Sequence, residues 1–378
     1  MKETKKVIPH VSKEYYDISA ISKCHAIYNM IIGQRSNGKT YAALKMALEH
    51  YLKTGEPSAY IRRLDEQIKP SNLDRLFSPF DIFEMTDQKY NGVRYWQRKF
   101  TLVFYDENGK VIRKDKSPFM FACSISTADT TKGQDRGFVK YIIFDEFLTR
   151  NFYLQNEYIL FQNLLSSLIR DRSGTVIYML ANTVNKSSIY FEEFGIHDIS
   201  KVKQGTIEVY EYGKNSKLKL ALEYCSESRI KKEVSKYFAF DNPRLKMITS
   251  GAWEIDNYPH APSGLNAINP ILIFFVDCRG LGAKAPYLQG NLYCKNSNPF
   301  IFFHYLTKEI KDPENKIIYS PEIDSNILHQ NTFDMAVIPA MKNINACITT
   351  NKIFYASNEV GEVLRNFKLT SKKRLAQM

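Results

Sequence analysis

Eight residues near the start of the chain have a spacing that could hold a phosphate group. Residues 33–40 read G-x-x-x-x-G-K-T, after an apolar run at 26–32 and before a segment with helical spacing at 41–52. Glycines at both ends let backbone N–H groups turn inward around an anion, and the following helix points its positive end at the same place. The pattern predicts a phosphate-binding loop that consists of Gly33, Gln34, Arg35, Ser36, Asn37, Gly38, Lys39 and Thr40.

The last two residues of this loop have the chemistry of a nucleotide site. Lys39 is expected to reach the outer phosphates, and the hydroxyl of Thr40 is expected to bind Mg²⁺. The alternative is a Gly/Ser turn beside a surface lysine. The position between a strand and a helix favours the phosphate loop, because that setting is the one in which the motif works.

A second stretch supplies carboxylates. Residues 141–147, YIIFDEF, form an apolar run that ends in Asp145 and Glu146. A magnesium nucleotide site needs a carboxylate behind the metal at the end of a neighbouring strand, and hydrolysis needs a group that polarises water. We assign the first role to Asp145 and the second to Glu146. A simple strand cap is the alternative, and the upstream phosphate loop argues against it.

Other polar residues follow apolar runs in the same half of the chain. Asn182 comes after the strand predicted at 175–180, where it could sense the terminal phosphate, and an Asn turn is the alternative. Arg62 and Arg63 follow the short strand predicted at 58–61. They could hold phosphate, bind DNA or be a solvated pair.

Composition sets wider limits. The chain has 378 residues, enough for two domains, and a net charge of +12, which favours a polyanionic partner over mere solubility charge. No apolar run approaches the length of a membrane span, so no membrane partner is expected, and the polar start does not resemble a signal peptide. Six dispersed cysteines without a C-x-x-C pair predict reduced thiols, no zinc and a cytosolic location.

Strand and helix patterns alternate through residue 183, which predicts an α/β fold with a mainly parallel sheet and helices on both faces. Residues 1–25 are expected to be a polar lead-in with a short helical piece, in which Tyr15 and Tyr16 pack or, alternatively, stack on a base. Residues 94–105 and 111–113 are expected to form a hairpin around Asn108-Gly109.

The second half of the chain has a different composition. We expect three parts: a P-loop ATPase domain at 1–222, a linker subdomain rich in Pro, Gly, Ser and Asn at 223–266, and a smaller α+β domain at 267–378. The last domain should contain short strands between 270 and 353 and a closing helix at 358–367. Asp277 follows an apolar strand, as a nuclease carboxylate would, but its candidate partners lack strand context, so nuclease activity is not expected.

The order of these motifs resembles one family. A phosphate loop, Tyr-Ile-Arg-Arg, Phe-Asp-Glu-Phe, Ile-Arg-Asp-Arg and Leu-Ala-Asn follow one another, as in the DNA-packaging ATPase of small short-tailed phages, the phi-twenty-nine-type encapsidation protein. The resemblance covers about residues 26–190 and implies a P-loop ATPase of the ASCE type, related to large-terminase ATPases. It also implies that the C-terminal domain resembles a degenerate RNase H-like nuclease.

The resemblance also implies roles for single residues. Gly33, Gly38, Lys39 and Thr40 match the phosphate loop of the family, while Asp145 and Glu146 match its metal carboxylate and catalytic glutamate. Arg170 matches the arginine finger that is inserted into the neighbouring subunit, with Arg172 as the second candidate. Lys132 matches a lysine that contacts nucleotide in trans. Arg62 and Arg63 match a paired arginine of the family, and Asn182 matches its sensor position. One departure is the absence of a central glycine in the loop, which has Arg35-Ser36-Asn37 instead.

The function implied by the resemblance is ATP hydrolysis with Mg²⁺ that drives double-stranded DNA into a viral procapsid. The implied assembly is a homopentameric ring on the portal, in the host cytoplasm, and the participation of a structural RNA is left open. Two alternatives stay open at this point. One is another P-loop translocase or helicase, and the other is a non-hydrolysing, nucleotide-gated assembly protein.

Overall fold

The structure is a computed structural model of the chain. The residues that it describes are 4–11, 15–128, 138–149, 153–154, 156–170, 172–186, 188–196, 199–213, 218–227, 253, 258–261, 265, 268–279, 281, 283–306, 308–320, 330–331, 333 and 338–375. Most of the linker predicted at 223–266 lies outside these ranges, and so does Lys132. The chain divides into two compact units, which are described one at a time below.

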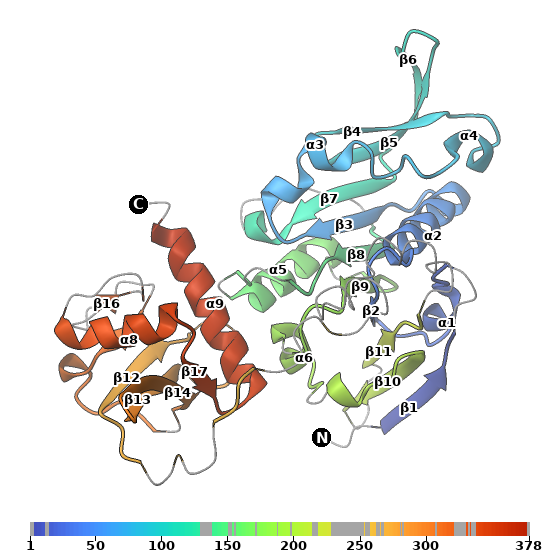
Figure 1. Ribbon diagram of the computed structural model, residues 1–378. Coiled ribbons are helices and arrows are strands. Elements are labelled where there is room, and N and C mark those ends of the chain that lie inside the picture. The colour runs from blue at the N-terminus through green and yellow to red at the C-terminus, as the bar shows by residue number, and fades with distance from the viewer. Residues whose placement is uncertain are drawn as a thin grey trace, which may run out of the picture. The chain divides into compact units, whose positions relative to one another are not determined.

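The first unit is built on an eleven-stranded sheet with the order β1-β10-β11-β2-β9-β8-β3-β7-β5-β4, and β6 pairs with β5 (Figure 1). Its central strands, from β11 to β7, run parallel, and antiparallel strands extend both edges. This confirms the predicted α/β class. The strands are β1 (Thr4–Pro9), β2 (Tyr28–Gly33), β3 (Ser58–Arg62), β4 (Gly92–Trp96), β5 (Lys99–Tyr105), β6 (Val111–Lys114), β7 (Met120–Ser124), β8 (Tyr141–Asp145), β9 (Val176–Asn182), β10 (Thr206–Tyr212) and β11 (Leu218–Tyr224).

The strand order positions the candidate chemistry. Strand β9 lies between β2, which leads into the phosphate loop, and β8, which ends in the carboxylates. Gly33 pairs with Asn182, and Asp145 pairs with Leu180. Because these strands are parallel, their carboxyl ends meet at one edge of the sheet, where open α/β sheets bind ligands.

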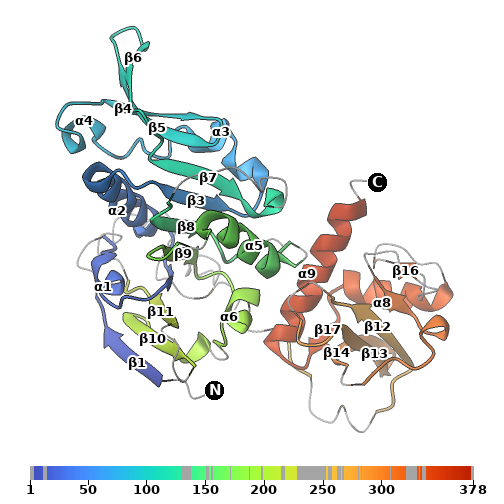
Figure 2. The same ribbon diagram turned by 180° about the vertical axis from the view of Figure 1, so that it is seen from behind.

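Two helices cover opposite faces of the parallel strands. Helix α2 (Lys39–Thr54) packs Leu44 and Leu48 into the core that contains Ile143 of β8. The next residue along β8, Phe144, points to the other face and contacts Phe161 of α5 (Glu157–Ile169) with a ring-centroid distance of 5.2 Å. Figure 2 shows α5 in front of the strands in the view from behind. The predicted helices on both faces are therefore present.

The boundaries of α2 follow from two glycines. Gly38 precedes the helix with φ +95° and Gly55 follows it with φ +75°, and the N–H of Gly55 bonds to the carbonyl of Tyr51 at 2.7 Å. Left-handed backbone favours glycine, so the sequence itself determines where α2 begins and ends. The shorter helices are α1 (Ser19–Ser22), α3 (Pro70–Leu73) and α4 (Ile82–Met85), with 3₁₀ turns η1 (Asp65–Ile68), η2 (Ile125–Thr127) and η4 (Ile199–Lys201).

Parts of this sheet differ from the sequence prediction. The run 94–105 is not one strand, because Gln97 and Arg98 adopt φ +48° and +59° and turn the chain from β4 into β5. The hairpin at 106–110 is confirmed. Strands β1, β10 and β11 were not predicted, although the short helical piece in the lead-in is present as α1.

A buried carboxylate fastens the lead-in to the sheet. Glu223 of β11 is 1% exposed and accepts hydrogen bonds from Nδ1 of His10 at 2.5 Å and from the hydroxyl of Tyr16 at 2.7 Å. The backbone N–H of Tyr16 donates to the carbonyl of Asn37 at 3.0 Å. One network therefore connects the segment after β1, the sheet and the phosphate loop.

This network gives a pH-dependent stability. The hydrogen bond to Glu223 raises the pKa of His10 above its ordinary value, so folding favours the protonated ring. The resulting stabilisation is present in full below the unfolded pKa of about 6.5 and is lost as the pH rises through the folded pKa. His10→Gln should therefore lower the free energy of unfolding by about 1 kcal/mol at pH 5.5 and by less at pH 8.5. Urea unfolding of both proteins across this range checks it, and an equal difference at both ends would contradict it.

The second unit contains a six-stranded sheet with the order β16-β15-β12-β13-β14-β17. Strands β12, β13 and β14 form an antiparallel meander, while β15 lies parallel to β12 and β17 lies parallel to β14. Its strands are β12 (Leu272–Asp277), β13 (Tyr287–Lys295), β14 (Asn298–Tyr305), β15 (Ile318–Tyr319), β16 (Gln330–Asn331) and β17 (Ile353–Tyr355), and its helices are α6 (Ile189–Glu193), α8 (Pro339–Thr349), α9 (Asn358–Leu375) and the 3₁₀ turn η8 (Pro313–Asn315).

The predicted strands and the closing helix of this unit are present, and α9 extends beyond the predicted end at 367. Asp277 at the end of β12 is buried, and both its oxygens accept hydrogen bonds from Arg279, with the shortest at 2.6 Å. Across both units, no helix among the described residues is apolar over the length that a bilayer crossing requires.

Candidate nucleotide-binding site

The phosphate loop has the backbone that its sequence predicts. Ser36 and Gly38 adopt left-handed φ values of +57° and +95°, which close the loop over the start of α2. A Cβ on Gly33 would lie 2.8 Å from Cβ of Cys225, so a larger residue cannot start the loop without displacing Cys225, which directly follows β11. The first and last glycines are thus required for different reasons, one by packing and the other by its dihedral angle.

The lysine of the loop points into the loop. Lys39 is 6% exposed, and its ammonium donates to the carbonyl of Gln34 at 2.7 Å and to Oδ1 of Asn37 at 3.0 Å. It also lies 3.5 Å from Oδ1 of Asn182 on the neighbouring strand β9. A buried cation ringed by oxygen atoms needs anionic or dipolar partners, and a bound phosphate oxygen is the partner that this position favours.

The threonine and the aspartate meet where a metal is needed. Oγ1 of Thr40 lies 3.3 Å and 3.2 Å from the two carboxylate oxygens of Asp145. The buried hydroxyl of Tyr60 donates to Oδ2 of the same carboxylate at 2.8 Å. A hydroxyl and a carboxylate beside a phosphate cradle are the hard oxygen ligands that Mg²⁺ takes, so these residues fit the metal.

Glu146 is held in an unusual backbone conformation. Its φ is +60°, which is uncommon for a residue with a side chain. Its side chain is 49% exposed, and its Oε2 pairs with Nη2 of Arg62 at 2.5 Å. Arg63 donates to the carbonyls of Glu146 and Phe147 at 3.1 Å and 2.7 Å, which fixes this turn of the chain.

These side chains line a cavity of about 280 Å³. Its walls are the loop residues 35–40 and Tyr41, together with Asp145, Glu146, Ala181 and Asn182. The structure therefore brings together the predicted loop, both carboxylates, the sensor position and Arg62 at one edge of the sheet. This arrangement can bind a phosphate chain with a metal and place a carboxylate next to it.

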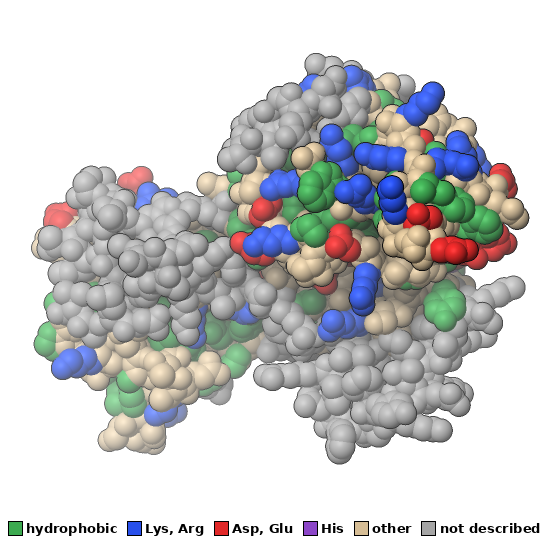
Figure 3. Space-filling view, turned by 90° about the horizontal axis from the view of Figure 1, so that it is seen from above, with side chains coloured by type: hydrophobic (Ala, Val, Ile, Leu, Met, Phe, Trp, Pro, Cys, Tyr) green, Lys and Arg blue, Asp and Glu red, His purple; other side chains and the backbone are tan. Residues whose placement is uncertain are grey.

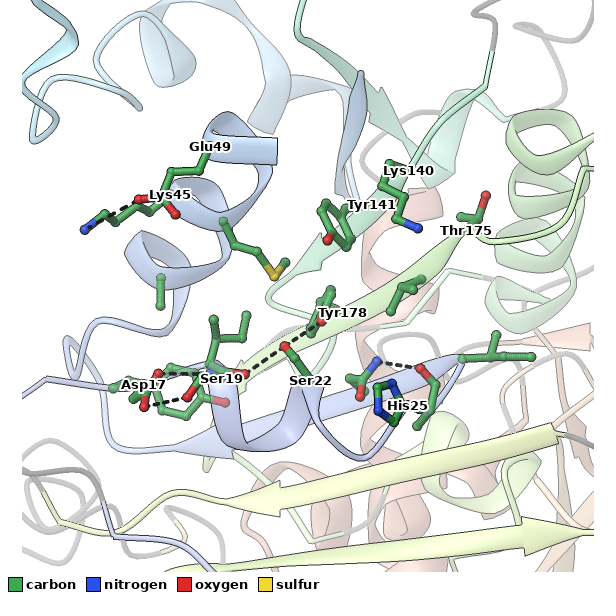
Figure 4. Close-up of a pocket in the computed structure, with 18 of the residues that line it drawn as sticks. Asp17, Ser19, Ser22, His25, Lys45, Glu49, Lys140, Tyr141, Thr175 and Tyr178 are labelled. Carbon is green, nitrogen blue, oxygen red and sulfur yellow. Dashed lines mark hydrogen bonds and ion pairs between the residues drawn. The ribbon is translucent and has the colours of Figure 1, made fainter. Parts of the chain in front are cut away.

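A larger cavity of about 1470 Å³ adjoins the first, and Ser36, Gly38 and Tyr41 line both. Figure 4 shows Lys45 and Glu49 on its α2 wall and Tyr141 and Tyr178 on its strand wall. Tyr15 also lines it and is 64% exposed, whereas Tyr16 is buried against Glu223. The two tyrosines thus have different environments, and Tyr15 is the one placed to stack on a base.

The two candidate finger residues lie at the other edge of the sheet. Arg170 directly follows the last residue of α5, and Arg172 lines the large cavity together with Lys140 and Thr175, which precede β8 and β9. The length of β9 separates this edge from Asn182, which is about 20 Å at the rise of a strand. Neither arginine lines the small phosphate cavity of its own chain, and Arg172 lines only the larger cavity next to it.

Sequence reasoning did not assign Tyr60 to the site. It was part of the apolar run 58–61, and nothing in that run indicated that its hydroxyl would face the end of β8. Burial and the charge of Asp145 raise the pKa of Tyr60 well above its ordinary value, so the hydroxyl stays protonated and remains a donor. Its position opposite Ile143 of β8 creates the contact.

We expect Tyr60→Phe to weaken metal binding. The variant keeps the ring in the core but removes the hydrogen bond that orients Asp145, and partners of metal ligands are worth about 10- to 100-fold in metal affinity. The Mg²⁺ concentration for half-maximal nucleotide binding should rise by that factor, with little change in thermal stability. Tyr95→Phe, which loses a hydroxyl bonded to the Ile68 carbonyl, is the matched control. An unchanged Mg²⁺ requirement would show that Tyr60 only packs.

A phosphate loop after β2, a carboxylate pair at the end of β8 and Asn182 on the strand between them give this unit the arrangement of the P-loop nucleotide-binding class. Comparison with known families specifies this further. Residues 12–236 match the Podovirus DNA encapsidation protein (Gp16) family, and the chain belongs to it.

Individual relatives agree with this assignment. The chain is 29% identical over 180 residues to the DNA packaging protein of Bacillus phage B103, a match that covers 46% of this chain and 50% of the relative. It is 26% identical over 193 residues to that of Bacillus phage phi29, which covers 50% and 52%. The chain thus spans about half the length of the curated relatives that it matches.

Solved structures share the fold over nearly the whole chain. The Phi-28 gp11 DNA packaging motor superposes with a TM-score of 0.55 at 16% identity and covers 96% of this chain and 99% of that chain. The bacteriophage Phi-29 viral genome packaging motor assembly gives a TM-score of 0.56 at 15% identity, with 95% and 100% covered. At these identities the likeness establishes the fold.

Proposed function

We propose that this protein is an ATPase that drives double-stranded DNA into a viral procapsid. The observation that carries the proposal is the convergence of Lys39, the Thr40–Asp145 pair and Glu146 on one small cavity, in a chain of the encapsidation family. The larger cavity next to the loop supports a nucleotide rather than a free phosphate, because it offers room for a base beside Tyr15.

The chemistry follows from the charges around the cavity. Hydrolysis places negative charge on the transferred phosphoryl group, and the ammonium of Lys39 with the N–H groups of the loop stabilises it. Mg²⁺, held by Thr40 and Asp145, would neutralise phosphate charge when bound. Glu146 polarises the attacking water. Its ion pair with Arg62 holds the carboxylate near the end of β8. Asn182 contacts the same lysine and is placed to report on the terminal phosphate.

A ring assembly explains the arginines at the far edge. Arg170 lies at the opposite end of β9 from the site, so a neighbouring subunit supplies the positive charge and hydrolysis depends on the subunit interface. We propose a homopentameric ring on the portal of the procapsid in the host cytoplasm. Arg172 and Lys132 are further candidates for contacts between subunits, and Lys132 lies outside the described residues. Whether a structural RNA takes part is left open.

For the second half of the chain we propose a vestigial nuclease-like domain at 267–378 that follows a linker at 223–266 and the ATPase domain at 1–222. The meander of β12, β13 and β14 with a parallel strand next to β12 supports it. Asp277 is engaged by Arg279, and Ser320 rather than a carboxylate lies 3.3 Å from it. Among the described residues, the contacts of Asp277 are with these groups and not with a second carboxylate of the kind that a two-metal nuclease uses.

ATP binding by Lys39→Ala tests the nucleotide site. The variant should lose about 10- to 100-fold in ATP affinity, because it removes the one buried cation that faces the phosphate cavity among the described residues. Lys53→Ala, an exposed lysine in the last turn of the same helix, should bind like the parent protein. Calorimetry with ATP and Mg²⁺ makes the comparison, and equal affinities for all three proteins would contradict the site.

A further inference from the structure

Three strands at one edge of the large sheet are unusually basic. Strands β4, β5 and β6 contain Arg94, Lys99, Arg113 and Lys114 but no aspartate or glutamate. In Figure 1 the hairpin of β5 and β6 projects from the edge of the sheet. These three strands are separate from the small phosphate cavity, because none of the residues that line this cavity belongs to them.

Strand register places most of this charge on one face. The facing pairs are Lys99 with Trp96, Arg94 with Thr101, and Lys114 with Val103. Directly opposed residues point to the same side of a sheet, and residues two apart along a strand do so as well. Arg94, Lys99 and Lys114 therefore share a face with Trp96, whereas Arg113 points to the other side, over Phe104.

The three cations on this face are exposed, and within the described ranges none of them forms an ion pair. Lys99 belongs to β5, Arg94 pairs with residue 101 of β5, and Lys114 pairs with residue 103. Along β5 the three positions follow one another at intervals of two residues, or about 7 Å. Surface charges that serve solubility are usually interspersed with the opposite sign. The three side chains on this face instead all carry positive charge and are regularly spaced. A polymer with regularly repeating negative charges would bind such a face favourably.

An aromatic side chain completes the surface. Trp96 is 59% exposed, and the guanidinium of Arg94 lies 5.6 Å from its ring centroid. Figure 3, the view from above, shows Lys and Arg side chains together with hydrophobic and acidic side chains on the described part of the surface. Exposed aromatic rings next to basic groups are typical of surfaces that contact nucleic acid through phosphate, sugar and base faces.

From these observations we infer that the face formed by Arg94, Trp96, Lys99 and Lys114 binds the phosphate backbone of double-stranded DNA. The inference rests on the proposed function and specifies where the duplex is contacted. Contacts of this kind position the protein without reading sequence, so the face suits a protein that must move along any DNA.

The test compares two triple variants of the full chain. One replaces Arg94, Lys99 and Lys114 by Gln, and the other replaces Lys53, Lys69 and Arg75, which are also exposed and belong to the same unit. Both lose three positive charges. Affinity for a labelled DNA duplex of about 30 base pairs is measured by fluorescence anisotropy between about 50 and 200 mM salt, and ATP hydrolysis without DNA reports that each protein is folded.

The face variant should lose about tenfold or more in affinity, and its plot of log K against log salt should be flatter by about 3. The control variant should keep the parent slope. Equal slopes for the parent and the face variant, or equal losses in both variants, would overturn the surface while leaving the ATPase proposal intact. ATP hydrolysis by a parent protein that binds no duplex would overturn the surface and the proposed substrate together. A loss seen with duplex RNA and not with duplex DNA would overturn the assignment to DNA.

Discussion

Glu146→Gln should lower ATP turnover by about 10²- to 10⁴-fold while leaving ATP binding intact. Glutamine has the same shape and keeps an oxygen that can accept from Arg62, so the turn at φ +60° and its contacts should persist. It cannot act as a base toward water. A positioned general base is worth about 10²- to 10⁴-fold, and the turnover number should fall by that amount. The ATP dissociation constant should change little, because the phosphates are held by the loop and by Lys39.

The matched control is Glu107→Gln in the exposed turn between β5 and β6, which changes the net charge equally. Its turnover should equal that of the parent protein. A Glu146→Gln protein with unchanged turnover would remove this residue from the chemistry. A variant that instead loses ATP binding would show that the carboxylate acts in binding and that the catalytic assignment is wrong.

Arg170→Ala should lower turnover by about 10³- to 10⁵-fold, the range found for arginine fingers. The reason is geometric, because Arg170 follows α5 at the end of the sheet opposite to Asn182, and β9 between these ends is about 20 Å long, so we expect Arg170 to act on a neighbour. Mixing provides the decisive readout. In a ring of Arg170→Ala and Glu146→Gln subunits, some interfaces place an intact arginine against an intact glutamate, and those interfaces should hydrolyse ATP.

Activity should therefore reappear when two inactive variants are combined, with a maximum at intermediate ratios. Arg172→Ala serves as the comparison, since it is the other candidate at the same edge. If mixtures containing Arg172→Ala recover and those containing Arg170→Ala do not, the finger is Arg172. An absence of recovery for both at every ratio would contradict a finger from this edge of the sheet.

The site was predictable wherever its chemistry is local in the sequence. The phosphate loop follows from glycine dihedral angles and from the strand and helix on either side, and Asp145 and Glu146 follow from an apolar run that ends in carboxylates. Parallel strands bring their carboxyl ends to one edge, and Asn182 lies at that edge beside the phosphate loop. The partners of these residues were not predictable. The contact from Tyr60 to Asp145 depends on β3 lying next to β8, and no residue spacing encodes that neighbour.

The edges of the sheet show a second limit. Strands β10 and β11 bury Glu208 and Glu223 among apolar residues, so neither reads as an apolar central strand. These carboxylates are tolerated because each accepts hydrogen bonds. Glu223 accepts from His10 and Tyr16 of the distant lead-in, and Glu208 accepts from Tyr210 on its own strand. The turn at Gln97-Arg98 has no glycine and therefore gave no turn signal, although both residues adopt positive φ. For Glu223, partners from distant segments overrode the local pattern.

The most direct test of the account is steady-state ATP hydrolysis by the purified protein with and without double-stranded DNA, next to Lys39→Ala. The account predicts turnover that DNA stimulates and that Lys39→Ala lacks under both conditions. Turnover that is the same with and without DNA, or that survives in Lys39→Ala, would contradict a DNA-driven motor that uses this site.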